Sequence, residues 1–345
     1  MKIGKWNTSF SLILPVVIML VSCVTEHDHN AGHNDYLKDE TPGIKTGGVR
    51  VIPIVSGTDT FNVWTKRIGN NPKVKLLLLS GGPGCTHEYF ECMESFLPAG
   101  GIEFIYYDQV GTGHSDNPDD SLYWDLDRYV EEVEQVRAAL NLDSSNFFLL
   151  GHSWGGILAM QYALKYQQHL KGLIVSNMMA SCPKYDDYAN EVLAKQMDPV
   201  VLDSIMAMEQ RGDFDNPQYM ALLEPHFYQQ HICRIPLSEW PEPMVRSFDQ
   251  INASLYVTMQ GPSEFGIAGR LTQWDVSDRL KEIVVPTLVI GATHDTMDPA
   301  YMKWMSKQFP QGSFLLCKNG SHMCMWDDQE TYMDGLMGFL RGIEN

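Results

Sequence analysis

The segment Gly151-His152-Ser153-Trp154-Gly155 places one serine between two glycines. It follows the apolar run Phe147 to Leu150 and precedes a stretch with helical spacing, the setting in which a strand turns sharply into a helix and exposes a serine hydroxyl. Side chains two positions from the serine would collide with such a tight turn, so glycines are needed there. We therefore expect Ser153 to be a nucleophile, and the alternative is a glycine-rich structural turn.

A serine hydroxyl becomes an effective nucleophile only when a base takes its proton and a carboxylate orients that base. Asp295 follows an apolar run that ends at Ile290, and His322 follows the last predicted strand near the C-terminus. The chain order Ser, Asp, His is the order found when this triad lies on a mostly parallel α/β sheet. Asp298 is the competing carboxylate. We favour Asp295 because it lies closer to the end of its strand.

The tetrahedral intermediate of acyl transfer needs backbone N–H donors beside the nucleophile. In this kind of site one donor is the residue after the nucleophile and another lies in the loop after the third strand. These positions correspond to Trp154 and to Gly82, which lies in Ser80-Gly-Gly-Pro-Gly84. We expect both amides to form an oxyanion hole, although the glycine-rich loop is also compatible with a purely structural turn.

The surrounding elements predict an α/β fold with a mostly parallel central sheet flanked by helices. Residues 49–55 and 61–67 alternate as in a hairpin, whereas later runs are almost continuously apolar, as in strands covered on both faces. Those runs are 75–79, 102–107, 146–150, 170–175, 284–290 and 313–317. Amphipathic helices are predicted over 122–140 and 154–170. Strands that alternate with helices indicate a doubly wound sheet.

The alternation stops between residues 181 and 274, a stretch rich in Met, Tyr and Pro. We interpret it as a helical lid inserted at the carboxyl ends of the strands, where sites in such folds lie. The core is then divided into residues 47–180 and 275–345.

The N-terminus carries Lys2, Lys5 and an apolar run too short to span a bilayer comfortably, which is typical of a signal peptide. The run ends in Leu-Val-Ser-Cys23 and resembles the lipobox of bacterial lipoproteins, so residues 1–22 are predicted to be removed and Cys23 lipidated. Residues 23–46 are polar and aperiodic, as in a flexible tether. The protein would then be exported and lipid-anchored to the cell envelope. The alternatives are a plain secretory signal or a single anchor helix.

The composition and motifs of the chain limit which partners, metals and cofactors it is expected to bind. The formal net charge of −18 opposes binding to nucleic acid. No Cys-x-x-Cys pair occurs, so we predict no metal site, and no phosphate-loop or dinucleotide fingerprint is present, so we predict no cofactor. His27, His29 and His33 lie in the predicted tether without an ordered register. Six cysteines follow Cys23, and the sequence leaves their pairing open.

Five stretches together resemble the prolyl aminopeptidases, also called proline iminopeptidases, and particularly their tricorn-interacting branch. The stretches are Ser80-Gly-Gly-Pro-Gly-Cys-Thr-His-Glu-Tyr89, Tyr107-Asp-Gln-Val-Gly-Thr-Gly-His-Ser115, Gly151-His-Ser-Trp-Gly-Gly156, Gly261-Pro-Ser-Glu-Phe265 and Gly291-x-x-x-Asp295. The resemblance implies an α/β-hydrolase fold with a helical lid and release of one N-terminal residue, often proline, from short peptides.

The resemblance also implies that Glu264 binds the free ammonium of the substrate, which fits the charge-assisted hydrogen bond that a carboxylate offers an amine. An exposed lid glutamate is the alternative. Two positions depart from the family pattern: Ser80 replaces a histidine, and Thr296 replaces a glutamate that commonly follows the triad aspartate. Asp298 or another lid carboxylate could substitute for that glutamate.

Three functions are compatible with these features of the sequence. The first is a serine aminopeptidase that acts on short peptides with a free N-terminus. The second is a small-molecule esterase or amidase with the same triad, since fold and triad do not fix the substrate. The third is a non-catalytic binding protein, against which the complete set of Ser, Asp and His argues.

Overall fold

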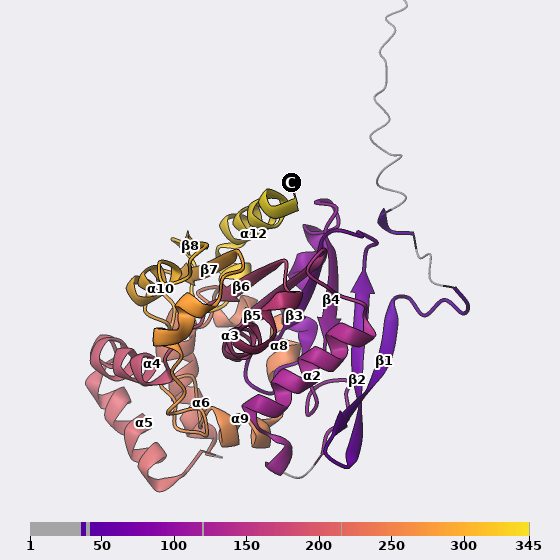
Figure 1. Ribbon diagram of the computed structural model, residues 1–345. Helices are drawn as coiled ribbons and strands as arrows, with labels where there is room; N and C mark the ends of the chain where they lie inside the picture. Colours follow the sequence, from indigo (N-terminus) through magenta and orange to yellow (C-terminus); the bar gives the residue numbers. More distant parts are fainter. Residues whose placement is uncertain (1–35, 39–41, 119–120, 215, 345) are drawn as a thin grey trace, which may run out of the picture.

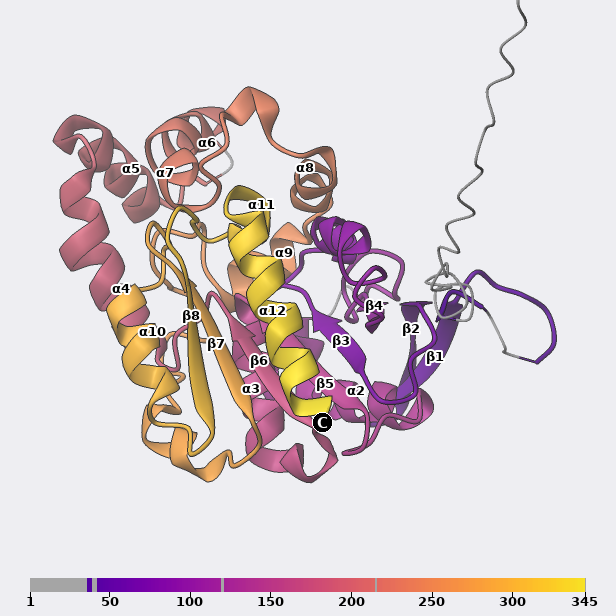
Figure 2. The same cartoon turned by 90° about the horizontal axis from the view of Figure 1, so that it is seen from above.

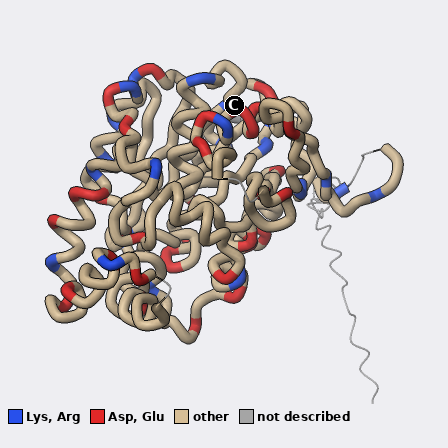
Figure 3. The backbone as a smooth tube through the Cα atoms, turned by 90° about the horizontal axis from the view of Figure 1, so that it is seen from below, with Lys and Arg blue, Asp and Glu red and all other residues tan. Residues whose placement is uncertain are grey.

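The computed structural model describes residues 36–38, 42–118, 121–214 and 216–344 (Figure 1). The predicted signal peptide, Cys23 and most of the predicted tether lie outside the described residues. Within the described ranges, no helix is both long enough and apolar enough to cross a membrane. Charged residues lie mainly on the outer helices and loops (Figure 3).

The described residues form one eight-stranded sheet with the order β1-β2-β4-β3-β5-β6-β7-β8. Strand β2 pairs antiparallel with both β1 and β4, and the other pairs are parallel. The strands are β1 (Val49–Ser56), β2 (Asp59–Ile68), β3 (Lys75–Leu79), β4 (Glu103–Tyr107), β5 (Phe147–His152), β6 (Gly172–Ser176), β7 (Thr287–Ala292) and β8 (Gly312–Cys317). The predicted hairpin and mostly parallel sheet are thereby confirmed.

The apolar runs form central strands because successive side chains enter two different cores. Leu77 and Leu79 of β3 pack with helices α2 (Leu126–Ala139), α3 (Trp154–Tyr166) and α10 (Pro299–Ser306) on one face. Leu76 and Leu78 pack on the other face, where 3-10 helix η1 (His87–Ser95) and helices α11 (Cys324–Asp327) and α12 (Gln329–Glu344) lie. Figure 2 shows α12 crossing the sheet on the face opposite α3.

Two helices differ from their predictions. Helix α2 begins at Leu126 and not at residue 122, because Asp125 has extended backbone and its carboxylate accepts hydrogen bonds from the amides of Asp127 and Arg128. Helix α3 is buried along most of its length and is not amphipathic, because it packs against β3, β5, β6 and α2.

Between residues 181 and 274 the described chain is mostly helical. The helices are α4 (Cys182–Tyr188), η4 (Ala189–Leu193), η5 (Ala194–Gln196), α5 (Pro199–Arg211), α6 (Pro217–Leu223), η6 (Glu224–Tyr228), α7 (Gln229–His231), η7 (Leu237–Glu239), α8 (Glu242–Asp249) and α9 (Ala253–Met259). Leu193, Ile205 and Leu223 belong to a separate apolar cluster within this segment. A bridge between Ser181 and Asp275 joins its two ends. Figure 2 shows α5, α6, α7 and α8 gathered at one end of the sheet.

Candidate active site

Ser153 occupies the turn between β5 and α3 with φ 55° and ψ −126°, a conformation that is strained for a residue other than glycine. Its amide donates to the carbonyl of Ser176 over 3.0 Å. A Cβ atom at Gly151 would lie 1.9 Å from the oxygen of Gly155, and one at Gly155 would lie 2.2 Å from the oxygen of Leu79. The two glycines are therefore required for the turn that presents the serine.

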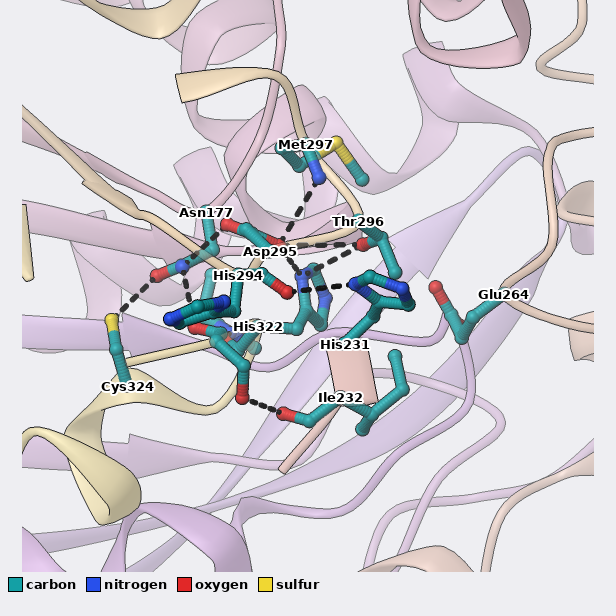
Figure 4. A network of polar contacts seen from close by, with 12 residues as sticks. Asn177, His231, Ile232, Glu264, His294, Asp295, Thr296, Met297, His322 and Cys324 are labelled. Atoms are coloured by element: carbon teal, nitrogen blue, oxygen red, sulfur yellow. Dashed lines mark hydrogen bonds and ion pairs between the residues drawn. The ribbon is translucent and has the colours of Figure 1, made fainter. Parts of the chain in front are cut away.

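His322 and Asp295 come together at the carboxyl end of the sheet (Figure 4). Asp295 follows β7 and His322 follows β8, and these strands are parallel neighbours. His322 Nδ1 lies 2.7 Å from Asp295 Oδ1, and both side chains are buried. Asp298 is separate from this pair, because it caps α10 by accepting a hydrogen bond from the amide of Ala300 over 2.8 Å.

The electrostatics of His322 suit a general base. Burial is the largest influence and favours the neutral imidazole, but the charge and the hydrogen bond of Asp295 together raise the pKa of His322 above its ordinary value. An imidazole that binds its proton more strongly is a better acceptor, and the carboxylate stabilises the imidazolium formed during the reaction. The other nearby imidazole differs, because burial lowers the pKa of His152 to about 3.

Asp295 is held by three residues besides His322. Asn177 Nδ2 donates to Asp295 Oδ2 over 2.7 Å, and the Met297 amide donates to Oδ1 over 3.2 Å. Thr296 Oγ1 lies 3.3 Å from Asp295 Oδ1 and 3.2 Å from His322 Nδ1. Sequence reasoning did not single out Asn177. The signal that could have found it is a polar residue directly after β6, beside the strand that leads to the nucleophile.

The loop that carries Gly82 is fastened to the start of α3. Gln109 Oε1 accepts a hydrogen bond from Trp154 Nε1 over 2.9 Å, and Gln109 Nε2 donates to the Ser80 carbonyl over 3.1 Å. The Gly81 amide donates to the Tyr89 hydroxyl, whereas the Gly82 amide has no acceptor among the described residues. Trp154 is the first residue of α3, so its amide has no helical acceptor.

Ser153, His322, Gly82 and Glu264 line one cavity of about 590 Å³ between the strand ends and the helical segment. Glu264 is fixed there by tyrosines. Tyr256 donates its hydroxyl to Glu264 Oε1 over 2.6 Å. The Tyr185 hydroxyl donates to the Glu264 carbonyl over 2.6 Å, and the Glu264 amide donates to the Tyr228 hydroxyl over 3.4 Å. Burial raises the pKa of Glu264, although His322 and Tyr256 act in the opposite direction.

Carboxyl side chains line the cavity. Its lining includes Glu224, Asp249 and Glu264, and no Lys or Arg is among the described residues that line it. A group with positive charge is therefore favoured within the cavity.

Among residues 36–38, 42–118, 121–214 and 216–344, no group of three or more His, Cys, Asp or Glu side chains is arranged to hold a metal ion. The six cysteines in these ranges carry free thiols. The histidines of the predicted tether lie outside the described residues.

Known proteins resemble this chain in both sequence and structure. The family model of the α/β-hydrolase fold matches residues 75–329. The chain is 56% identical over 295 residues to proline iminopeptidase from Chitinophaga pinensis, which covers 86% of this chain and 99% of that protein. The crystal structure of VinJ matches with a TM-score of 0.79 at 29% identity, over 85% of this chain and 99% of VinJ. Proline iminopeptidase from Mycobacterium smegmatis matches with a TM-score of 0.75 at 28% identity, over 86% and 98%.

Proposed function

Because the chain belongs to the proline iminopeptidase family of α/β hydrolases, we propose that it is a serine aminopeptidase. Its substrates are short peptides with a free N-terminus, from which it releases proline or another small or apolar residue. The observation that carries the proposal is the position of Glu264, whose carboxylate lines the same cavity as Ser153 and His322.

The proposed reaction is acyl transfer through Ser153. His322 takes the proton of the Ser153 hydroxyl as its oxygen attacks the carbonyl carbon of the N-terminal residue, while Asp295 stabilises the imidazolium. The Gly82 and Trp154 amides donate to the oxyanion of the tetrahedral intermediate. When the C–N bond breaks, His322 returns the proton to the leaving amine. Water then attacks the acyl-enzyme with His322 again as base. The bond between the acyl carbon and Ser153 Oγ breaks, His322 returns the proton to that oxygen, and the amino acid is released.

Glu264 explains why only the terminal residue would be removed. A single Cα separates the ammonium of a free N-terminus from its carbonyl carbon, so a carboxylate close to His322 accepts the ammonium only when the terminal peptide bond lies at Ser153. Position 296 is a threonine and has no carboxylate to offer the substrate. Its hydroxyl contacts Asp295 and His322. In our proposal Glu264 therefore carries amine recognition.

We predict that Glu264→Gln separates amine recognition from catalysis. The variant should lower kcat/KM for prolyl- and alanyl-naphthylamides by about ten- to a hundredfold, because a neutral amide loses the charge-assisted hydrogen bond to the ammonium. Simple esters without an amine should be cleaved almost as before. The measurement is kcat/KM for each substrate class.

The control for this prediction is Glu239→Gln, which removes an exposed lid carboxylate that does not line the cavity. It should leave both substrate classes unchanged. If the wild type cleaves acetylated substrates as well as free amines, and Glu264→Gln changes neither, the esterase or amidase function replaces the aminopeptidase.

We also propose that residues 181–274 form a lid over a catalytic core made of residues 47–180 and 275–345. The lid contributes Glu264 and the tyrosines that fix it, and the core contributes Ser153, Asp295 and His322. This division is supported by the separate apolar cluster of the helical segment and by the bridge at its base.

For location, we propose that residues 1–22 are removed and that Cys23 carries a lipid which anchors the enzyme to the bacterial cell envelope. Cys23→Ser should abolish incorporation of labelled palmitate and leave the protein either soluble or as uncleaved precursor. Ser22→Ala, which keeps a small residue before the cysteine, should remain lipidated. Mass spectrometry that finds an unmodified mature N-terminus elsewhere in residues 23–46 would contradict this proposal.

A further inference from the structure

Asn177 has an unusual conformation directly after β6. Its φ is 52°, in the left-handed region that residues other than glycine seldom adopt, and its side chain is fully buried. The Asn177 amide donates to the Ile290 carbonyl over 2.8 Å, which fixes Asn177 against β7, the strand that leads to Asp295. Asparagine adopts this conformation more readily than most residues that carry a Cβ, and here the conformation accompanies a polar side chain that is fully buried.

The Asn177 side chain uses its hydrogen-bonding capacity in full. Its nitrogen Nδ2 donates to Asp295 Oδ2 over 2.7 Å and to the Ser321 carbonyl over 3.3 Å. Its oxygen Oδ1 accepts from the Ser176 hydroxyl over 2.8 Å. The same oxygen accepts from the Cys324 thiol over 3.3 Å (Figure 4). The Asp295 carboxylate and the Ser321 carbonyl determine the orientation of the amide, because both groups only accept hydrogen bonds, so the NH₂ group must face them.

We propose that Asn177 is a positioning residue of the catalytic triad. It holds Asp295 Oδ2, so that Oδ1 faces His322 Nδ1, and it holds the carbonyl of Ser321, the residue before His322. One side chain, which directly follows strand β6, thus fixes the positions of both Asp295 and His322. The proposal rests on the acyl-transfer function given above, but it concerns the geometry of the base and not the choice of substrate.

The decisive variant is Asn177→Gly, because glycine accepts a positive φ while it removes all four side-chain hydrogen bonds. We expect kcat for prolyl-naphthylamide to fall about ten- to a hundredfold with KM within about twofold, because the donor acts on the base and not on the substrate. The rate at which a fluorophosphonate labels Ser153 should fall by the same factor. Asn141→Gly is the matched control: Asn141 has φ 54° but is exposed and remote from the triad, so its replacement should leave both rates unchanged.

The pH profile distinguishes positioning from a general structural effect. The acidic limb of kcat/KM reports the deprotonation of His322, whose pKa Asp295 raises. Without Asn177 the carboxylate is less well aligned, so the limb should move to lower pH, towards the ordinary histidine value. The titratable groups that face His322 are Asp295, Glu264, Asp327 and the His152 ring, and only Asp295 among them is bonded to Asn177.

A second pair of variants provides the test if Asn177→Gly does not fold. Cys324→Ala removes one donor to Asn177 Oδ1 and should lower kcat a few-fold, whereas Cys324→Ser retains a donor and should restore most of the activity. The proposal is overturned if folded Asn177→Gly keeps the kcat and the acidic limb of the wild type, or if Cys324→Ala and Cys324→Ser behave alike. If the wild type cleaves no free-amine substrate, the proposed aminopeptidase function fails, and the fluorophosphonate rates still test Asn177.

Discussion

Ser153→Ala and His322→Ala should each lower kcat for prolyl-naphthylamide by about 10⁴-fold or more, while the protein remains folded. The first variant removes the atom that forms the acyl-enzyme. The second removes the base that takes the proton from that atom and returns it to the leaving amine. Since both side chains act in the same step, the double variant should be hardly slower than either single variant. The measurements are kcat, fluorophosphonate labelling and the thermal unfolding midpoint.

The control for these variants is His294→Ala. His294 adjoins Asp295 in sequence, but the hydrogen bonds that the structure gives it use its backbone amide and carbonyl, and its side chain is partly exposed. Its replacement should therefore retain most of the activity. Retention of more than about one-hundredth of the wild-type kcat by either triad variant would show that another nucleophile or base operates.

Local sequence patterns were sufficient for the parts of the fold in which neighbours along the chain decide the structure. The run 75–79 is strand β3 at the predicted bounds, because five apolar or half-buried positions between polar turns suit a strand covered on both faces. The glycines around Ser153 have the geometric role expected of them, because the clash they avoid lies within the same turn and the adjacent β3. Helix ends were predicted less well, as Asp125 shows.

Contacts between residues far apart in the sequence were not predictable in this way. Asn177 and Asp295 are separated by 118 positions, and Gln109 lies 45 positions from the Trp154 side chain it binds. Each residue belongs to an unremarkable polar turn when its local sequence is considered alone. Only the order of strands β5, β6 and β7 brings such turns to one edge of the sheet. Periodicity contains no information about that order.

The departure at Thr296 illustrates the same limit. Sequence comparison marked this position as the loss of a carboxylate, whereas the structure gives the threonine hydroxyl contacts with Asp295 and His322. The threonine that stands in place of the carboxylate belongs to the hydrogen-bond network around the base. This explains how the pattern can change at this position while the triad geometry is retained.

Asp295→Asn should lower kcat by about 10³- to 10⁴-fold, whereas Asp298→Asn should change it by less than about twofold. An asparagine at 295 has a single, uncharged oxygen. It therefore cannot accept one hydrogen bond from His322 Nδ1–H and another from Asn177 Nδ2–H on two separate carboxylate oxygens, as Asp295 does. Its NH₂ group must face one of these two donors.

If that NH₂ group faces His322, the imidazole is held in the wrong tautomer and cannot accept the proton of Ser153. If it faces Asn177, two donors oppose each other in a buried site, which costs the hydrogen bond that holds the carboxylate. Asp298, by contrast, caps α10, and asparagine is an equally good N-terminal cap, so stability should also be unchanged. Both variants are to be compared by kcat and by thermal unfolding. The assignment of the carboxylate is wrong if Asp298→Asn shows the large loss of kcat and Asp295→Asn turns over normally.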